Sequence, residues 1–455
     1  MKRSWVQPVI NRLQRGAMSK FGHNPFYERR VRESIAGASV AELVARFGSP
    51  LFVYDERALR RRYREAMSSF STRYPNVVFG WSYKTNYLKA ICALMHREGA
   101  WAEVVSEMEY DKARSLGVPG DRIIFNGPHK KPAVLERAVR EGATINVDHL
   151  DELADLEAIA GRLRRTVGVG LRLNLDAGIF PQWSRFGLNL ESGQAMDAVK
   201  RIAQRGRLRV NGLHCHIGTF ILDPKAYGRQ VAKMVAWGYE LKDHFGFEME
   251  FIDIGGGFPS ASRLKGSYLP PDVGVPAMDE YAEAVGDAML RALRPGDCPR
   301  LVLESGRAMI DEAGSLITSI VASKRLPDGT RAYVADAGVN LLYTSQWYKF
   351  RVEIDRDTPG VNETSVIYGP MCMNIDAIDE GVLLPPLQRG HRLILSPVGA
   401  YNNTQWLQFI EYRPNVVLVG EHGEVELIRE AEDLSDIERR EVLPARLALR
   451  KEERV

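Results

Sequence analysis

A lysine, a pair of histidines, a triple glycine and a glutamate lie at or just beyond the ends of short apolar stretches in this chain. They are Lys84, His214 with His216, residues 255–257, and Glu304. A lysine at such a place can form an imine with a carbonyl group. Glycines let the backbone approach an anion closely, and a carboxylate can keep a proton on a ring nitrogen. Together these groups predict a catalytic site.

Eight apolar stretches recur in order and alternate with longer stretches of helical character. They cover residues 77–79, 102–105, 123–125, 144–147, 169–173, 210–213, 251–254 and 301–303. This order is typical of a parallel (β/α)8 barrel of the α/β class, whose active site lies at the C-terminal ends of its strands. The groups at those ends are Lys84, Glu107, His129, Asp148, Asn174, His214 with His216, the triple glycine, and Glu304 with Arg307.

The last two strands of this barrel predict a phosphate site. Gly255, Gly256 and Gly257 follow the seventh strand and Arg307 follows the eighth. In such barrels these two loops commonly bind a phosphate through backbone N–H groups. A phosphate site beside the imine-forming Lys84 predicts pyridoxal 5′-phosphate as the cofactor.

Two further groups suit that cofactor. Glu304 is placed to face the pyridine nitrogen and to keep it protonated, which makes the ring an electron sink. His214 and His216 are two residues apart, so both side chains lie on one side of their strand, and the flat imidazole of His216 could stack on the ring.

Each of these features has another interpretation. Lys84 could be a surface lysine, the triple glycine a tight turn, and Glu304 a structural partner of an arginine. The histidine pair on one strand also resembles a metal pair, with His129 and His149 after other strands. A metal-dependent hydrolase is therefore the competing class.

Length and composition set the frame. The 455 residues predict one large domain plus a smaller one, and the 45% apolar and 26% charged content is that of an ordinary globular protein. The net charge of +3 does not favour nucleic acid as a partner. We find neither a signal-peptide core nor a membrane-spanning apolar run, which predicts a cytoplasmic protein without membrane contact. The four cysteines are widely separated, without a C-x-x-C pair, and are expected as free thiols.

The predicted organisation has four parts. Residues 1–34 are an N-terminal extension, residues 61–307 the cofactor-binding barrel, and residues 431–455 a charged C-terminal tail with a short helix. Residues 35–60 and 308–430 form a mostly antiparallel β domain, with strands at 51–54, 315–322, 331–335, 365–368, 393–396 and 416–419. A capping box of Ser39 and Glu42 starts a helix that ends before Gly48.

Ordered motifs run from about Ser39 to about Val419. They are Phe52-Val53-Tyr54-Asp55, Tyr83-Lys84-Thr85-Asn86, Val104-Val105-Ser106 with Glu109, Ser184-Arg185-Phe186-Gly187, Gly212-Leu213-His214-Cys215-His216-Ile217-Gly218-Thr219, Glu304-Ser305-Gly306-Arg307, Cys372 with Asp376, and Gly399-Ala400-Tyr401. With these motifs the chain resembles the fold-type III pyridoxal-phosphate decarboxylases, which include the diaminopimelate, ornithine and arginine decarboxylases. The resemblance is greatest to members of the diaminopimelate type.

That resemblance implies roles for the motif residues. Lys84 carries the cofactor as an imine, His216 stacks on the ring, and Glu304 pairs with the pyridine nitrogen. The phosphate is bound by Thr219, Gly255, Gly256, Gly257, Arg307 and Tyr401.

The resemblance also implies a homodimer with shared active sites. Cys372, Asp376 and Tyr401 would reach the cofactor of the opposite chain. Cys372 would be the acid that protonates the α-carbon after carbon dioxide leaves, a role suited to a thiol whose pKa lies near neutrality.

The chain departs from the family pattern where the substrate is expected. Diaminopimelate enzymes have a glutamate directly after the catalytic cysteine and ornithine enzymes an aspartate, but this chain has Met373, which offers no charge to an ammonium group. No arginine follows Asn340, where diaminopimelate enzymes carry one for the far carboxylate. With neutral groups such as Asn374 nearby, we expect Met373, Asn374 and Asp376 to bind a small amino-acid-type substrate. We expect a modified or conjugated amino acid, as in siderophore or antibiotic biosynthesis.

Other activities stay open at this stage. The chain could be a diaminopimelate decarboxylase proper that makes L-lysine, or a non-catalytic relative. An alanine-racemase-like enzyme would share the barrel and the cofactor, but those enzymes place an arginine against the pyridine nitrogen, and Glu304 therefore favours decarboxylation.

Overall fold

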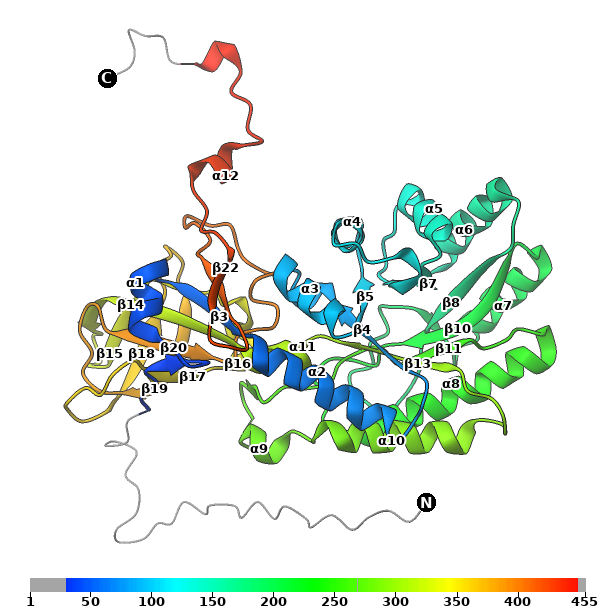
Figure 1. Cartoon of the computed structure of the whole chain (residues 1–455), viewed down its shortest axis with the longest axis horizontal. Coiled ribbons are helices and arrows are strands. Elements are labelled where there is room, and N and C mark those ends of the chain that lie inside the picture. The colour runs from blue at the N-terminus through cyan, green and yellow to red at the C-terminus, as the bar shows by residue number, and fades with distance from the viewer. Residues whose placement is uncertain (1–29, 268, 449–455) are drawn as a thin grey trace.

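The computed structural model describes residues 30–267 and 269–448, which form two domains side by side along the long axis of the molecule (Figure 1). Most of the predicted N-terminal extension, residues 1–29, lies outside the described residues, as do residues 449–455 of the predicted tail. Among the described helices, none is both long and apolar enough to cross a membrane.

A closed parallel barrel is the larger domain, as the sequence predicted. Its strands are β4 (Val77–Ser82), β5 (Trp101–Val104), β6 (Ile123–Phe125), β7 (Thr144–Val147), β8 (Val167–Asn174), β10 (Leu208–Cys215), β11 (Phe251–Asp253) and β13 (Arg300–Ser305). Each pairs in parallel with the next in this order, and β13 pairs with β4, with Leu301 opposite Val77, so no strand edge is left open. Alternating helices and strands produce this closure because each helix returns the chain to the same end of the sheet.

Helices surround the barrel. They are α2 (Glu56–Ser71), α3 (Lys89–Arg97), α4 (Glu107–Ser115), α5 (Pro132–Glu141), α6 (Leu150–Leu163), α7 (Gln194–Arg205), α8 (Pro224–Phe245) and α10 (Met278–Ala292), with the short α9 (Pro271–Gly274) and α11 (Arg307–Ile310). In α5, for example, Leu135, Ala138 and Val139 recur at helical spacing and are buried, and the helix ends at the left-handed Gly142. The predicted domain boundaries at residues 60 and 307 fall inside α2 and α11, so both helices continue through them.

The second domain is built on a largely antiparallel sheet. Its strands are β3 (Leu51–Asp55), β14 (Gly314–Arg325), β15 (Arg331–Ala335), β17 (Arg351–Ile354), β18 (Glu363–Tyr368), β19 (Ala377–Leu384), β20 (Arg392–Ser396), β21 (Val416–Val419) and β22 (Val425–Arg429). The pairs β15–β18 and β3–β21 are parallel. The sequence did not predict β17, β19 or β22. β17 has only four residues, and β19 carries Asp379, Glu380 and Gly381, residue types that are rare in strands.

One strand from before the barrel lies at the centre of this sheet. β3 pairs with β14 on one side and with β21 on the other. Helix α1 (Val40–Phe47) packs on it, with Val40 and Leu43 buried against Val53, and begins at Ser39, whose side chain accepts the N–H of Glu42 as predicted. The fold of the β domain therefore requires segments from both ends of the chain.

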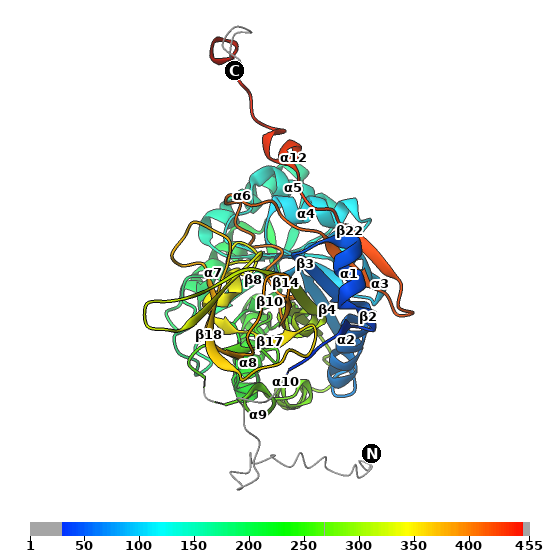
Figure 2. The ribbon, with the colours of Figure 1, turned by 90° about the vertical axis from the view of Figure 1, so that its left-hand side faces the viewer.

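Several short elements complete the structure. β1 (Ser34–Ile35) pairs with β2 (Ala38–Ser39), β9 (Leu188–Asn189) pairs in parallel with the end of β8, and β12 (Arg263–Leu264) pairs with β16 (Tyr348–Lys349). The last pair joins a loop of the barrel to the β domain. Helix α12 (Leu434–Glu438) lies on a C-terminal segment that stands away from both domains (Figures 1 and 2).

A buried ion pair stabilises the barrel near its C-terminal end. The Lys130 side chain is fully buried, and its Nζ lies 2.6 Å from Glu152 Oε1. The same Nζ donates to the carbonyl oxygens of Gly127, at 2.9 Å, and Asn146, at 3.0 Å. One ammonium group thus joins the segments of β6 and β7 to helix α6.

We predict that Lys130→Met lowers the free energy of unfolding by about 3 to 5 kcal/mol, because it leaves the Glu152 carboxylate buried without a cation. The neighbouring Lys131→Met is the matched control. Lys131 is 59% exposed and pairs with Glu107 at the surface, where solvent screens the pair, so its loss should leave the free energy of unfolding almost unchanged. Urea unfolding of both variants measures the difference, and equal effects would contradict the prediction.

Candidate active site

A cavity of about 330 Å³ lies where the strands of the barrel end. Eight of the predicted site residues line it: Lys84, His216, Thr219, Gly256, Gly257, Glu304, Arg307 and Tyr401. Seven come from the barrel and Tyr401 from the second domain. The cavity is therefore closed only when the two domains pack together.

Lys84 extends into this cavity from a short 3-10 turn directly after β4. Its side chain is 41% exposed, and its Nζ pairs with the Glu103 carboxylate on the neighbouring strand. Glu103 is buried and also accepts the Ser82 hydroxyl at 2.6 Å and the Asn126 amide at 3.0 Å. Burial lowers the pKa of Lys84, but the carboxylates of Glu103 and Glu304 outweigh it and raise that pKa above its ordinary value.

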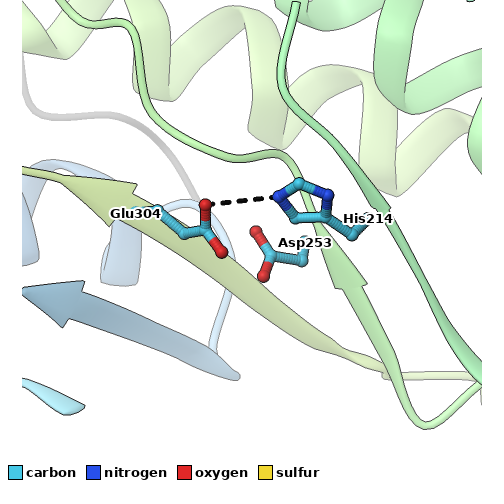
Figure 3. Close-up of side chains that lie close together, drawn as sticks. All are labelled: His214, Asp253 and Glu304. Atoms are coloured by element: carbon cyan, nitrogen blue, oxygen red, sulfur yellow. Dashed lines mark hydrogen bonds and ion pairs between the residues drawn. The ribbon is translucent and has the colours of Figure 1, made fainter. Parts of the chain in front are cut away.

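Three buried groups from adjacent strands meet at one wall of the cavity (Figure 3). His214 on β10, Asp253 on β11 and Glu304 on β13 lie with their ligand atoms within 4.8 Å of one another. Glu304 Oε2 is 3.2 Å from His214 Nε2, and Asp253 Oδ1 accepts the N–H of Gly255 at 2.9 Å.

The two carboxyl groups differ in protonation. Burial, and then the charge of Glu304, raise the pKa of Asp253 well above its usual range. Burial acts on Glu304 in the same sense, but His214, Lys84 and the hydrogen bond with Asp253 together lower the pKa of Glu304 below its usual range. Asp253 therefore keeps the proton, and Glu304 is the carboxylate at the cavity wall.

His216 presents an uncharged ring to the cavity. Its Nδ1 accepts the N–H of Gly256 at 2.9 Å, which assigns the ring proton to Nε2. The Trp183 ring contacts it edge-on, with centroids 5.3 Å apart. Burial, together with the positive charges of Arg172 and Lys84, lowers the pKa of His216 to about 3. The predicted stacking of this imidazole on a cofactor ring is compatible with its position.

Another part of the cavity wall can hold an anion. A Cβ added at Gly256 would lie 2.1 Å from a backbone oxygen, and one at Gly257 would lie 2.2 Å from another, so no other residue type fits there. The Arg307 guanidinium lies between two aromatic rings, 4.6 Å from the Tyr348 centroid and 4.8 Å from the Tyr401 centroid. A backbone that carries no side chains, next to a guanidinium group held in place, suits the binding of a phosphate group.

Two more residues shape this side. Gly255, which the sequence assigned to the phosphate site, is not among the residues that line the cavity. A Cβ there would lie 2.8 Å from His216, so the glycine leaves room for that ring. Ser305 does line it, and its buried hydroxyl has no hydrogen-bond partner among the described residues. A bound group would supply one.

Tyr401 corrects the prediction that it serves the opposite chain. It lines the cavity of its own chain, with φ at +67°, and its N–H donates to the carbonyl oxygen of Thr85 at 2.8 Å. Thr85 directly follows Lys84. The loop after β20 therefore returns across the mouth of the same barrel.

The remaining predicted residues lie on the loop between β18 and β19 and do not line this cavity within the described chain. Cys372 and Asn374 are exposed, and Met373 is half-buried. Asp376 is buried, and its two carboxylate oxygens accept the N–H groups of Val339 and Met371, each at 2.8 Å. The Asp376 carboxylate therefore shapes this loop from inside its own chain, and its contact with substrate stays a prediction.

Sequence reasoning missed several residues that line the cavity. They include Ser82, Glu103, Asn126, Arg172, Trp183 and Phe186. Glu103 and Arg172 had a recognisable signal, since each is a charged residue between apolar residues of a strand. Two of the predicted strand-end residues, Glu107 and His129, are exposed and do not line the cavity. The rival histidine set does not assemble around this cavity either, because His149 is half-buried and does not line it.

Comparisons with known proteins decide the family. A family model described as pyridoxal-dependent decarboxylase, pyridoxal binding domain, matches residues 58–311, which is more than half of the chain. The chain belongs to the fold-type III pyridoxal-phosphate decarboxylases. A diaminopimelate decarboxylase from Aquifex aeolicus is 31% identical over 429 residues, which cover 90% of this chain and 96% of that protein. One from Methanocaldococcus jannaschii is 29% identical and covers 91% and 95%.

A solved structure shows the same architecture. The crystal structure of the M. jannaschii diaminopimelate decarboxylase in complex with L-lysine has a TM-score of 0.83 and 27% identity, and the match covers 93% of this chain and all of that one. The protein is thus a pyridoxal-phosphate-dependent amino-acid decarboxylase of the diaminopimelate, ornithine and arginine decarboxylase family. The cavity fits the cofactor, with a lysine, a carboxylate and a cradle for an anion on its walls.

The depressed pKa of His216 predicts a pH effect on the cofactor-free protein. Between pH 6.5 and about 4, the unfolded chain protonates this histidine and the folded chain does not. Stability from this residue is therefore complete above pH 6.5 and falls with pH by up to about 1.4 kcal/mol per unit. We predict that wild type loses stability more steeply than His216→Gln over this window, measured by urea unfolding. Parallel curves for the two proteins would contradict the assignment.

Proposed function

We propose that this decarboxylase acts on an amino acid whose distal end is modified or conjugated, rather than on free diaminopimelate. The supporting observation is the lack of a charged side chain at the two positions where the family binds the distal charges. The residue after Cys372 is Met373, and Leu341, Leu342 and Tyr343 follow Asn340.

The second of these stretches begins with two apolar residues that are buried. Leu341 and Leu342 are buried, and the hydroxyl of Thr344, also buried, donates to Asn402 Oδ1 at 2.9 Å. A free ammonium or carboxylate placed here would lose its hydration without gaining an opposite charge. A neutral amide or ester linkage would not incur that cost.

Diaminopimelate decarboxylase proper is the second candidate. It is favoured by the full-length similarity to enzymes of that name. At 29% to 31% identity the barrel and the cofactor site are shared, whereas the residues around the distal end of the substrate are free to differ.

Each residue of the site has its own proposed role in the reaction. Bound pyridoxal phosphate supplies an electron sink, and Lys84 anchors it at the cavity mouth. The Glu304 carboxylate keeps a proton on the ring nitrogen, while Gly256, Gly257 and Arg307 bind the phosphate. We assign the return of a proton to the α-carbon to Cys372, whose thiol is exposed in the single chain.

We predict carbon dioxide release from diamino acids whose distal amine carries a neutral amide with a kcat/KM about a hundredfold above that for meso-diaminopimelate, since one unpaired charge costs some 2 to 3 kcal/mol. Lys84→Ala should release none from any substrate. Met373→Glu is the converse variant and should move preference toward free diamino acids. If meso-diaminopimelate turned over as well as the conjugates, the protein would be a diaminopimelate decarboxylase, and the proposal of a conjugated substrate would be wrong.

We also propose that the active form is a homodimer that shares its sites. Cys372 is exposed and lies outside the cavity of its own chain, beside Ile375, whose side chain is 58% exposed. Phe409, Ile410 and Tyr412 on another loop are also exposed, at 39%, 60% and 48%. Apolar loops of this kind are typical of a subunit interface, and a second copy would bring Cys372 to a neighbouring cavity.

Mixing two inactive variants tests this sharing. Lys84→Ala and Cys372→Ala are each expected to be inactive, but a heterodimer has one site with both residues intact. Random exchange of subunits should therefore restore roughly a quarter of wild-type activity. Cys298→Ala, at the other exposed thiol, should stay active alone, and no recovery in the mixture would mean that Cys372 does not act across subunits.

A further inference from the structure

A second hollow, of about 510 Å³, lies at the end of the barrel opposite the active site. The starts of the strands form it: Trp101 begins β5, Thr144 begins β7, Val167 begins β8 and Arg300 begins β13. Catalysis uses the other ends of the same strands, so this hollow has no part in the reaction described above.

Its wall carries an excess of positive charge. The basic residues that line it are Arg122, Arg140, Arg165, Arg209 and Arg300, and the acidic ones are Asp121 and Glu250. Five guanidinium groups face two carboxylates, which leaves a net charge of about +3 in a protein whose total is also +3.

Three of these arginines have no carboxylate within ion-pair distance in the described part of the chain. Arg140 pairs with Glu136 at 2.6 Å and Arg209 with Glu250 at 2.8 Å. Arg122 is exposed without such a partner, Arg165 donates to a backbone carbonyl, and Arg300 lies 4.8 Å from the centre of the Trp101 ring.

The two ends of the barrel are separated by apolar packing. Ile124, Phe251 and Val302 form a buried cluster against which Trp101 packs. A ligand in the basic hollow would therefore contact Trp101 at its base and guanidinium groups at its sides. The apolar packing prevents it from passing into the catalytic cavity.

We propose that this hollow binds a small anion that carries two or more phosphate or carboxylate groups. Guanidinium groups bind such groups through paired N–H donors and stay charged at every physiological pH. The volume is that of a metabolite site. Binding would neutralise the excess charge and stabilise the folded barrel, because the strands that form the hollow separate on unfolding.

Calorimetric titration of the dialysed, pyridoxal-phosphate-loaded holoenzyme at constant ionic strength tests the proposal. The probes are inorganic pyrophosphate and citrate, and the bound cofactor keeps both out of the active-site phosphate cradle. We expect saturable binding at one equivalent per chain. Arg300→Gln and, separately, the exposed Arg122→Gln should each weaken it at least tenfold. Because Arg122 is exposed, Arg122→Gln should fold normally and keeps the test valid if Arg300→Gln does not fold.

Arg439→Gln is the control, because it removes one positive charge from the exposed C-terminal segment. It should bind both probes as wild type does. Tighter pyrophosphate binding would identify a phosphate ligand and tighter citrate binding a polycarboxylate. Absence of saturable binding, unchanged binding in both hollow variants, or equal weakening in the control would overturn the proposal.

Discussion

The barrel interior imposes the constraint on which the rest of this structure depends. Closing eight strands into a ring buries every side chain that points inward, and a charged group there must find a partner. Glu103 pairs with Lys84, and Glu304 with His214. Arg172 lies 3.2 Å from Asp148 and stacks on the Phe186 ring. These contacts fix the orientation of the groups that catalysis needs before any ligand arrives.

Two carboxyl groups at the cavity wall differ in protonation because their surroundings differ. Asp253 and Glu304 are both buried carboxyl groups on neighbouring strands, yet Glu304 faces His214 and ionises while Asp253 stays protonated. Only an ionised carboxylate can accept a hydrogen bond from a protonated pyridine nitrogen and stabilise the proton there, and the electron-withdrawing strength of the cofactor depends on that proton. The neutral His216 beside it adds no competing charge.

The second domain is part of the active site rather than an appendage. β3 comes before the barrel in the sequence, and β14 and β21 come after it, yet the three strands form one sheet. The barrel is therefore inserted between the segments that build the second domain. The pairing of β12 with β16 joins the domains again. This arrangement places Tyr401 over Arg307, where the two would close around an anion.

The sequence alone determined the barrel, its strand order, the cofactor and the residues at the strand ends, because apolar periodicity and motifs such as Glu304-Ser305-Gly306-Arg307 are local. It did not reveal Glu103 or Asn126 as wall residues, since inward orientation depends on strand register. Tertiary structure alone decided that Tyr401 serves its own chain and that the Asp376 carboxylate is occupied by backbone N–H groups. Both outcomes depend on contacts between segments far apart in the chain, and those contacts exist only after the loops have packed across the barrel.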